Sequence, residues 1–207
     1  MNYLLLVRHS LPEIRLDVSP KEWDLSPVGR QRCEFLAKQL RAYAPAVVVT
    51  SAERKAVQTG TIVAQNLGIP VAASAGLHEH ERDKVVDGNS ENFETLLAHF
   101  FAQPSGLVFG SETAGQALQR FSGALTEVLN QYPSKNVVVV AHGTVITLWA
   151  TALTGEDPLT FWKRLGMPSI VVFSRPAQHP HIFPYIPATP REPIYGAYRT
   201  CRMKRNF

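Results

Sequence analysis

Short, continuous runs of valine, leucine and isoleucine recur along this chain, and they limit its fold more than any other feature. Five such runs have the length of strands, and they span residues 3–7, 46–50, 69–72, 136–141 and 169–173. Most of them lack the polar–apolar alternation of a half-exposed strand. They are typical of strands that a parallel sheet buries on both faces.

Helical patterns fill the intervals between these runs. Apolar residues repeat at helical spacing after Ser26-Pro27, after Arg54, and again over residues 93–100 and 117–128. Ser26 is expected to cap the first of these helices, with Pro27 at its first position. The alternation predicts an α/β fold, a three-layer doubly wound arrangement in which helices cover both faces of a mostly parallel sheet.

A single α/β domain over residues 1–175 accounts for most of the 207 residues. Residues 78–110 are longer than a connection needs and carry their own helix, so we expect a small inserted lobe there, over the active site. Residues 176–207 contain six prolines and no clear periodicity. They are predicted to form a Pro-rich basic C-terminal arm.

The charge distribution bears on the class of partner. The net charge is +4, but six of the 21 Lys and Arg residues, and only one of the 17 acidic ones, lie from Arg175 onward. A nucleic-acid-binding protein spreads its basic residues over one face or along a helix. We therefore expect no nucleic-acid partner; a homodimer stays open.

The chain has the composition of a protein kept in a reducing compartment. Its two cysteines, Cys33 and Cys201, are far apart in sequence and form no disulfide framework or metal knuckle. The first eight residues lack the length of a signal peptide, and no apolar run is long enough to span a membrane. A cytoplasmic protein without membrane contact is expected.

Polar clusters follow four of the five predicted strands. In chain order they are Arg8-His9-Ser10, Ser51-Ala-Glu-Arg54, Leu77-His-Glu79 and His142-Gly143-Thr144. In an open parallel sheet, ligands bind just beyond the carboxyl ends of the strands. The four clusters are therefore expected to converge on one site.

These segments resemble, in content and in order, the motifs of the histidine phosphatase superfamily, also called the phosphoglycerate mutase-like fold. The likeness covers roughly residues 3–173. It is carried by Leu6-Val7-Arg8-His9-Ser10, Leu25-Ser-Pro-Val-Gly29-Arg-Gln31, Thr50-Ser-Ala-Glu-Arg54-Lys-Ala-Val-Gln58-Thr59, Leu77-His-Glu79, Gly110-Ser-Glu112 and Val140-Ala-His142-Gly143. Ser10 departs from the glycine that is usual in this family.

The resemblance implies a phosphatase that hydrolyses a phosphomonoester through a covalent phosphohistidine, with no cofactor and no metal. His9 would be the nucleophile, Glu79 the proton donor to the leaving alcohol, and His142 a further catalytic residue. A neutral imidazole is a good nucleophile, and nearby arginines would disfavour its protonation. Glu79 must start protonated, which burial beside an anionic phosphate would favour. Glu81 stays open as an alternative acid.

The resemblance also implies a set of phosphate-binding residues. Arg8, Arg54 and His142 would contact the phosphoryl oxygens, because guanidinium groups match phosphate geometry and stabilise the charge of the transition state. Ser10 could add a hydroxyl donor, or be strained if its position needs a positive φ. Gly143 would allow the backbone to approach the ligand closely.

Residues outside these motifs have simpler expected roles. Ser111-Glu112 is expected to cap the helix that follows, and Arg120 to form an ion pair on a helix surface. Specificity is expected to come from lobe residues around Arg82, Lys84 and Phe93. A small phosphorylated metabolite is favoured over a phosphoprotein as substrate.

Three other interpretations remain open at this point. The alternating sequence His78-Glu79-His80-Glu81 could hold a metal ion, since both imidazoles would point to one side of a strand. A phosphoglycerate-type mutase would need a long lobe that shields the phosphohistidine from water, and the inserted region is short. A non-catalytic module that binds a phospho-ligand or a partner is the third interpretation.

Overall fold

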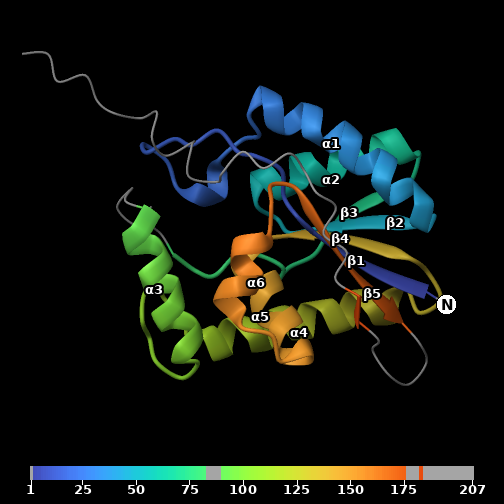
Figure 1. The fold of residues 1–207 in the computed structure, drawn as a ribbon. Coiled ribbons are helices and arrows are strands. Elements are labelled where there is room, and N and C mark those ends of the chain that lie inside the picture. The colour runs from blue at the N-terminus through green and yellow to red at the C-terminus, as the bar shows by residue number, and fades with distance from the viewer. Residues whose placement is uncertain (1, 83–89, 176–181, 184–207) are drawn as a thin grey trace, which may run out of the picture.

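A six-stranded sheet forms the centre of the computed structural model, which describes residues 2–82, 90–175 and 182–183 (Figure 1). The strand order is β3-β2-β4-β1-β5-β6. Strands β1 to β4 pair in parallel, whereas β5 and β6 run antiparallel to their neighbours. The strands are β1 Asn2–Arg8, β2 Val47–Thr50, β3 Val71–Ala73, β4 Val137–Ala141, β5 Ser169–Arg175 and β6 Ile182–Phe183.

All five predicted strands are present, with ends shifted by one or two residues. Strands β2 and β4 are buried along their whole length, as their continuous valine runs predict. Strand β3 differs because it lies at the edge of the sheet with all three residues exposed. The short strand β6 lies within the predicted arm, and the rest of the arm falls outside the described residues.

Helices cover both faces of the sheet, so the predicted three-layer α/β class is confirmed (Figure 1). Helices α1 and α2 pack on one face, and α4 and α5 pack on the other. Ser26 caps α1 as predicted, accepting a hydrogen bond from the N–H of Gly29. The helices are α1 Pro27–Leu40, α2 Arg54–Leu67, α3 Ser90–Ala102, α4 Ala114–Gln131, α5 Gly143–Thr154 and α6 Pro158–Arg164, with short 3₁₀ turns at Pro20–Glu22 and Arg41–Tyr43.

The described part of the predicted lobe centres on α3. Its residue Phe100 is buried with Ala114 and Ala117 of α4 and Leu148 of α5. An ion pair of 2.6 Å between Glu94 and Lys163 joins α3 to α6. Among the described residues, no helix combines the length and the apolar character needed to cross a membrane.

Close packing of α2 against β2 fixes where the first turn of α2 lies. A Cβ on Gly60 would come within 2.2 Å of the Thr50 Cγ2 atom, so the helix can approach the strand this closely only because residue 60 has no side chain. The first turn of α2 is thereby held at the carboxyl end of β2, beside the ends of β1 and β4.

Candidate active site

His9 and His142 lie together at the carboxyl edge of the sheet, as predicted. His9 follows β1 and His142 follows β4, and these two strands are neighbours. Their ring centroids are 5.2 Å apart. Both side chains are buried, with 6% of His9 and none of His142 exposed.

The orientation of the His9 ring is fixed by a hydrogen bond of 2.7 Å between Nδ1 and the backbone carbonyl of Ser10. A carbonyl only accepts, so Nδ1 carries the proton and Nε2 keeps its lone pair. Burial holds the pKa of His9 well below its ordinary value, and the charges of Lys55 and Arg8 lower it further. The imidazole is therefore neutral and has the protonation state of a nucleophile.

Ser10, the residue after His9, is held by contacts with α1 and α2. Its hydroxyl donates to the carbonyl of Gly29 at 2.7 Å, and its N–H donates to Thr59 Oγ1 at 3.0 Å. Among the described residues other than glycine, only Ala44 has a positive φ, so Ser10 is not strained. The hydroxyl is thus directed at α1 and does not add the phosphate donor that the sequence suggested.

Arg8 extends from the end of β1 towards α5 and α6. Its Nη1 donates to the carbonyl of Leu165 at 2.8 Å, and its Cζ lies 5.6 Å from the centroid of the Trp162 ring. A Cβ on Gly143 would come within 3.0 Å of the Arg8 Cζ and Nε atoms. Gly143 therefore makes room for the guanidinium group of Arg8.

His142 is the N-cap residue of α5 and contacts the end of β2. Its Nε2 lies 2.8 Å from Ser51 Oγ, and its buried Nδ1 has no hydrogen-bond partner among the described residues. Burial, followed by the charge of Lys55, lowers the pKa of His142 well below its ordinary value, although Glu79 acts in the opposite direction.

The structure does not bring Arg54 to the two histidines. The Arg54 side chain is 58% exposed and donates to Asp24 at 2.9 Å. The next residue, Lys55, is instead buried, with 6% of its side chain exposed. Its Nζ donates to the carbonyl of Pro20 at 2.7 Å and forms an ion pair with Glu53. Neighbouring residues of a helix point about 100° apart, which explains why Lys55 is buried while Arg54 is exposed.

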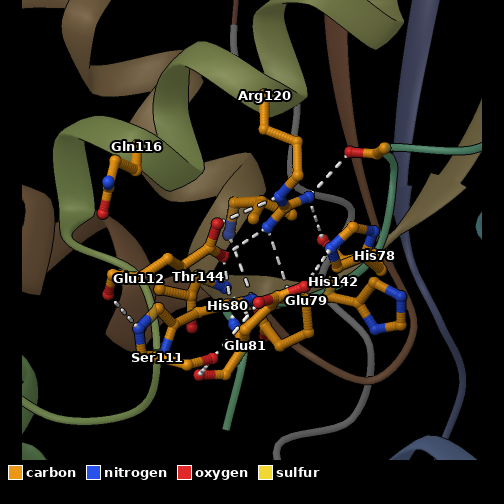
Figure 2. Close-up of polar contacts among 12 residues, drawn as sticks. His78, Glu79, His80, Glu81, Ser111, Glu112, Gln116, Arg120, His142 and Thr144 are labelled. Atoms are coloured by element: carbon orange, nitrogen blue, oxygen red, sulfur yellow. Dashed lines mark hydrogen bonds and ion pairs between the residues drawn. The ribbon is translucent and has the colours of Figure 1, made fainter.

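Glu79 reaches the N-terminus of α5, where its carboxylate accepts from the N–H groups of Thr144 at 3.1 Å and Val145 at 3.3 Å (Figure 2). Burial would raise the pKa of Glu79, but Arg82, His142 and hydrogen bonds from the backbone N–H groups of His80 and Thr144 lower it overall. The expectation that Glu79 starts protonated therefore does not hold in the absence of substrate.

An ion pair between Arg120 and Glu112 holds the loop that carries Glu79 (Figure 2). Arg120 Nη1 donates to the carbonyls of Gly76 at 2.7 Å and His78 at 3.0 Å, and Nη2 donates to that of Glu79 at 3.2 Å. The predictions of a surface ion pair for Arg120 and of a capping role for Ser111-Glu112 are therefore wrong. Thr113 is the N-cap of α4, in a reciprocal capping box with Gln116.

Glu81 and His80, the residues that follow Glu79, have partners of their own away from the two active-site histidines. Glu81 Oε1 lies 3.3 Å from His78 Nε2, and Glu81 Oε2 accepts from Ser111 Oγ at 3.1 Å. His80 is buried, with its ring centroid 4.4 Å from that of Phe100, and its Nε2 lies 2.9 Å from the carbonyl of Glu112. Nowhere in the described ranges do three His, Cys, Asp or Glu side chains gather as a metal ion requires.

Two of the predicted specificity residues are described. The Arg82 guanidinium lies 4.9 Å from the centroid of the Phe93 ring. Phe93 in turn meets Trp162 edge to face, with centroids 5.9 Å apart, and Trp162 lies against Arg8. The third residue, Lys84, is outside the described residues.

Comparison with known proteins agrees with this arrangement. The model of the histidine phosphatase superfamily (branch 1) matches residues 4–182. The chain belongs to this superfamily. The predicted enzyme class, phosphatase, is confirmed by this match together with a curated relative, the uncharacterized phosphatase PhoE of Bacillus subtilis (strain 168). That relative is 25% identical over 161 residues, which are 76% of this chain and 80% of the relative.

Solved structures of this superfamily share the fold. A mutant phosphoserine phosphatase from Entamoeba histolytica in complex with phosphoserine is 20% identical, with a TM-score of 0.72 over 90% of this chain and 96% of that one. YhfR of Bacillus stearothermophilus is 21% identical, with a TM-score of 0.71 over 89% and 96% of the two chains. A mycobacterial glucosyl-3-phosphoglycerate phosphatase is 19% identical, with a TM-score of 0.65 over 83% and 89%.

Proposed function

We propose that this histidine phosphatase hydrolyses phosphomonoesters through a covalent phosphohistidine on His9. In the first step, His9 Nε2 attacks phosphorus, the bond from phosphorus to the ester oxygen breaks, and Glu79 donates a proton to the leaving alcohol. In the second step, water attacks the phosphohistidine, Glu79 takes a proton from that water, and phosphate leaves. Covalent transfer divides one difficult step into two easier ones.

The orientation and the neutral state of His9 carry this proposal. Its Nδ1–H is directed to the carbonyl of Ser10, which leaves the Nε2 lone pair for attack. Because burial keeps the pKa of His9 well below its ordinary value, the nucleophile is not lost to protonation until the pH falls far below 6.5.

The charge of the transferring phosphoryl group would be stabilised by Arg8, Lys55 and His142. Arg8 and Lys55 supply the positive charge, and each is largely buried, so their electrostatic effect is stronger than it would be in water. Lys55 replaces Arg54 in the predicted set because its ammonium group, unlike the Arg54 guanidinium, is buried beside the two histidines and lowers both of their pKa values.

Glu79 is well placed as the acid, although it is ionised in the empty site. Its carboxylate adjoins His142 and the start of α5, where a phosphate would bring a second negative charge. Two anions close together favour protonation of one of them. The substrate itself would thus supply the condition under which Glu79 takes up the proton that it later donates.

We propose a small phosphorylated metabolite as the substrate class. Structural neighbours include a phosphoserine phosphatase solved with phosphoserine and the same enzyme solved with 3-phosphoglyceric acid. In the present chain, Phe93 and Arg82 would receive the organic part of such a compound, because Phe93 contacts both Arg82 and Trp162, and Trp162 lies against Arg8.

Rapid quenching after mixing with a phosphomonoester tests the mechanism. We expect acid-labile, base-stable phosphate on the wild type and none on His9→Ala, whose turnover should fall by a factor on the order of 10³ or more. His99→Ala, which removes an exposed histidine of α3, is the matched control and should behave as the wild type. Turnover by His9→Ala at the wild-type rate would overturn the proposal.

A further inference from the structure

Glu53 is a carboxylate buried within the proposed phosphate site, and the predicted mechanism has no role for it. Only 6% of the residue is exposed. Its Oε2 pairs with Lys55 Nζ, and its Oε1 accepts from the N–H of Glu79 at 2.8 Å and lies 3.6 Å from His142 Nε2. Both of its oxygens therefore face groups that the proposed reaction uses.

The ion pair between Glu53 and Lys55 carries no net charge. Glu53 neutralises Lys55, and Glu79 adds a second carboxylate, while burial keeps His9 and His142 neutral. A phosphate that bonds to Lys55 must enter beside the Glu53 carboxylate. Like charges this close, with little water between them, strongly favour protonation of one partner.

We propose that Glu53 is a counter-ion that the phosphate displaces from Lys55 and that takes up a proton from solvent as it is displaced. In the empty site, ionised Glu53 keeps the buried ammonium group paired. In the complex, Lys55 bonds to a phosphate oxygen, and the protonated carboxyl group of Glu53 carries no charge that repels it. This inference rests on the proposed function only in requiring that phosphate enters this pocket.

The groups around Glu53 limit where that proton can go. They are Lys55 from α2, His9 at the end of β1, His142 before α5, and the Glu79 loop. The histidines are poor acceptors because burial holds their pKa values well below the ordinary value. Burial would raise the pKa of Glu53, but Lys55 lowers it overall, and removing Lys55 as a partner reverses that balance.

Calorimetric titration of the full-length protein with inorganic phosphate, in buffers of different ionisation enthalpy, counts the protons taken up on binding. At a pH above the pKa that Glu53 has in the free protein and below the pKa that it has in the complex, we expect the wild type to take up about one proton more than Glu53→Gln. Free phosphate titrates identically in both experiments, so its protonation in solution cancels. In Glu79→Gln, which removes the other acidic carboxyl group, Glu53 should still take up its proton when phosphate binds.

The phosphate affinity supplies a second measurement. Glu53→Gln should bind phosphate about tenfold more tightly than the wild type for each unit by which phosphate raises the Glu53 pKa, and this excess should shrink as the pH falls below the pKa that Glu53 has in the complex. Glu53→Asp, which keeps the charge, should still take up the proton. Circular dichroism of each variant checks that it is folded.

The outcomes separate this inference from the proposed function. Equal proton uptake and equal pH dependence for wild type and Glu53→Gln would overturn the inference, and so would loss of phosphate binding in a folded Glu53→Gln. Neither result affects the phosphohistidine on His9, which is measured with substrate. Conversely, absence of phosphohistidine would refute the proposed function and leave the binding measurements valid.

Discussion

Two sides of the active site are built by different kinds of interaction. On the proposed nucleophile side, at the end of β1, Ser10 is held by hydrogen bonds to Gly29 and Thr59, and the His9 ring is held by a hydrogen bond to the Ser10 carbonyl. On the cation side, at the start of α2, Lys55 is held by the buried carboxylate of Glu53.

The difference concerns what each side must do when phosphate arrives. The hydrogen bonds that orient His9 involve atoms other than Nε2, so they can persist while the nucleophile attacks. The ion pair of Lys55 uses the same ammonium group that would bind the phosphate. Under the proposals above, the nucleophile side is ready before binding, whereas the cation side would exchange one anion for another.

Replacing Lys55 is the strongest test of this comparison. Lys55→Met should lower kcat/KM by on the order of 10²–10³, as expected for loss of a charge that stabilises the transition state. Steady-state kinetics would measure it. The matched control is Arg54→Ala, which removes the neighbouring exposed cation and should change kcat/KM by less than about twofold.

A loss of folding could imitate the effect of Lys55→Met, because that variant leaves Glu53 buried without its partner. The double variant Glu53→Gln/Lys55→Met removes both charges and should unfold at a temperature closer to that of the wild type while remaining as inactive as the single variant. If Arg54→Ala proved the more damaging change, the phosphate would bind to Arg54, as the sequence suggested.

The sequence predicts the nucleophile side well because the relevant signals are local. An apolar run followed by Arg8-His9 places a histidine at the end of a buried strand, whatever the rest of the chain does. The same holds for the other strands. Helix α5 was not predicted, because it is buried on nearly all sides and its sequence therefore lacks an amphipathic pattern.

On the cation side the sequence pointed to Arg54, whereas the structure buries Lys55, because the direction of a helical side chain depends on where the helix turns. A difference of one residue rotates it by about 100°. The sequence spacing could have indicated that Lys55 is buried. Lys55 precedes Thr59 by four positions, so both residues lie on the same, buried face of α2. Glu53 and Arg120 both contact the loop that carries Glu79, which is distant from them in the sequence, and no local pattern reveals such contacts.

Removing Arg120 should disturb the position of Glu79, the proposed general acid, and leave His9 and Ser10 in place. Arg120→Ala deletes the donors to three loop carbonyls and leaves the Glu112 carboxylate without its positively charged partner, which should cost about 3 kcal/mol of unfolding free energy. With the Glu79 loop loosened, kcat/KM for alkyl phosphates should fall about 10- to 100-fold, because general acid catalysis needs close positioning.

Aryl phosphates provide the comparison for Arg120→Ala, since a phenolate of low pKa leaves without a proton. Their kcat/KM should fall much less, and phosphohistidine should still form from them. Denaturant unfolding would measure the stability, and the ratio of the two substrates would isolate the acid. A parallel loss of activity on both substrates would show that Arg120 supports the whole site and not the acid alone.

The smallest effect is expected on the nucleophile side itself, for Ser10→Gly. Glycine removes the hydrogen bond from the Ser10 hydroxyl to the carbonyl of Gly29 and adds backbone freedom, so stability should fall by about 1 kcal/mol and the unfolding temperature by about 2–4 °C. Thermal unfolding with and without phosphate would test this. Because the hydroxyl points to α1, both curves should shift equally. A larger shift with phosphate present would mean that Ser10 contacts the ligand, and that the nucleophile side also rearranges on binding.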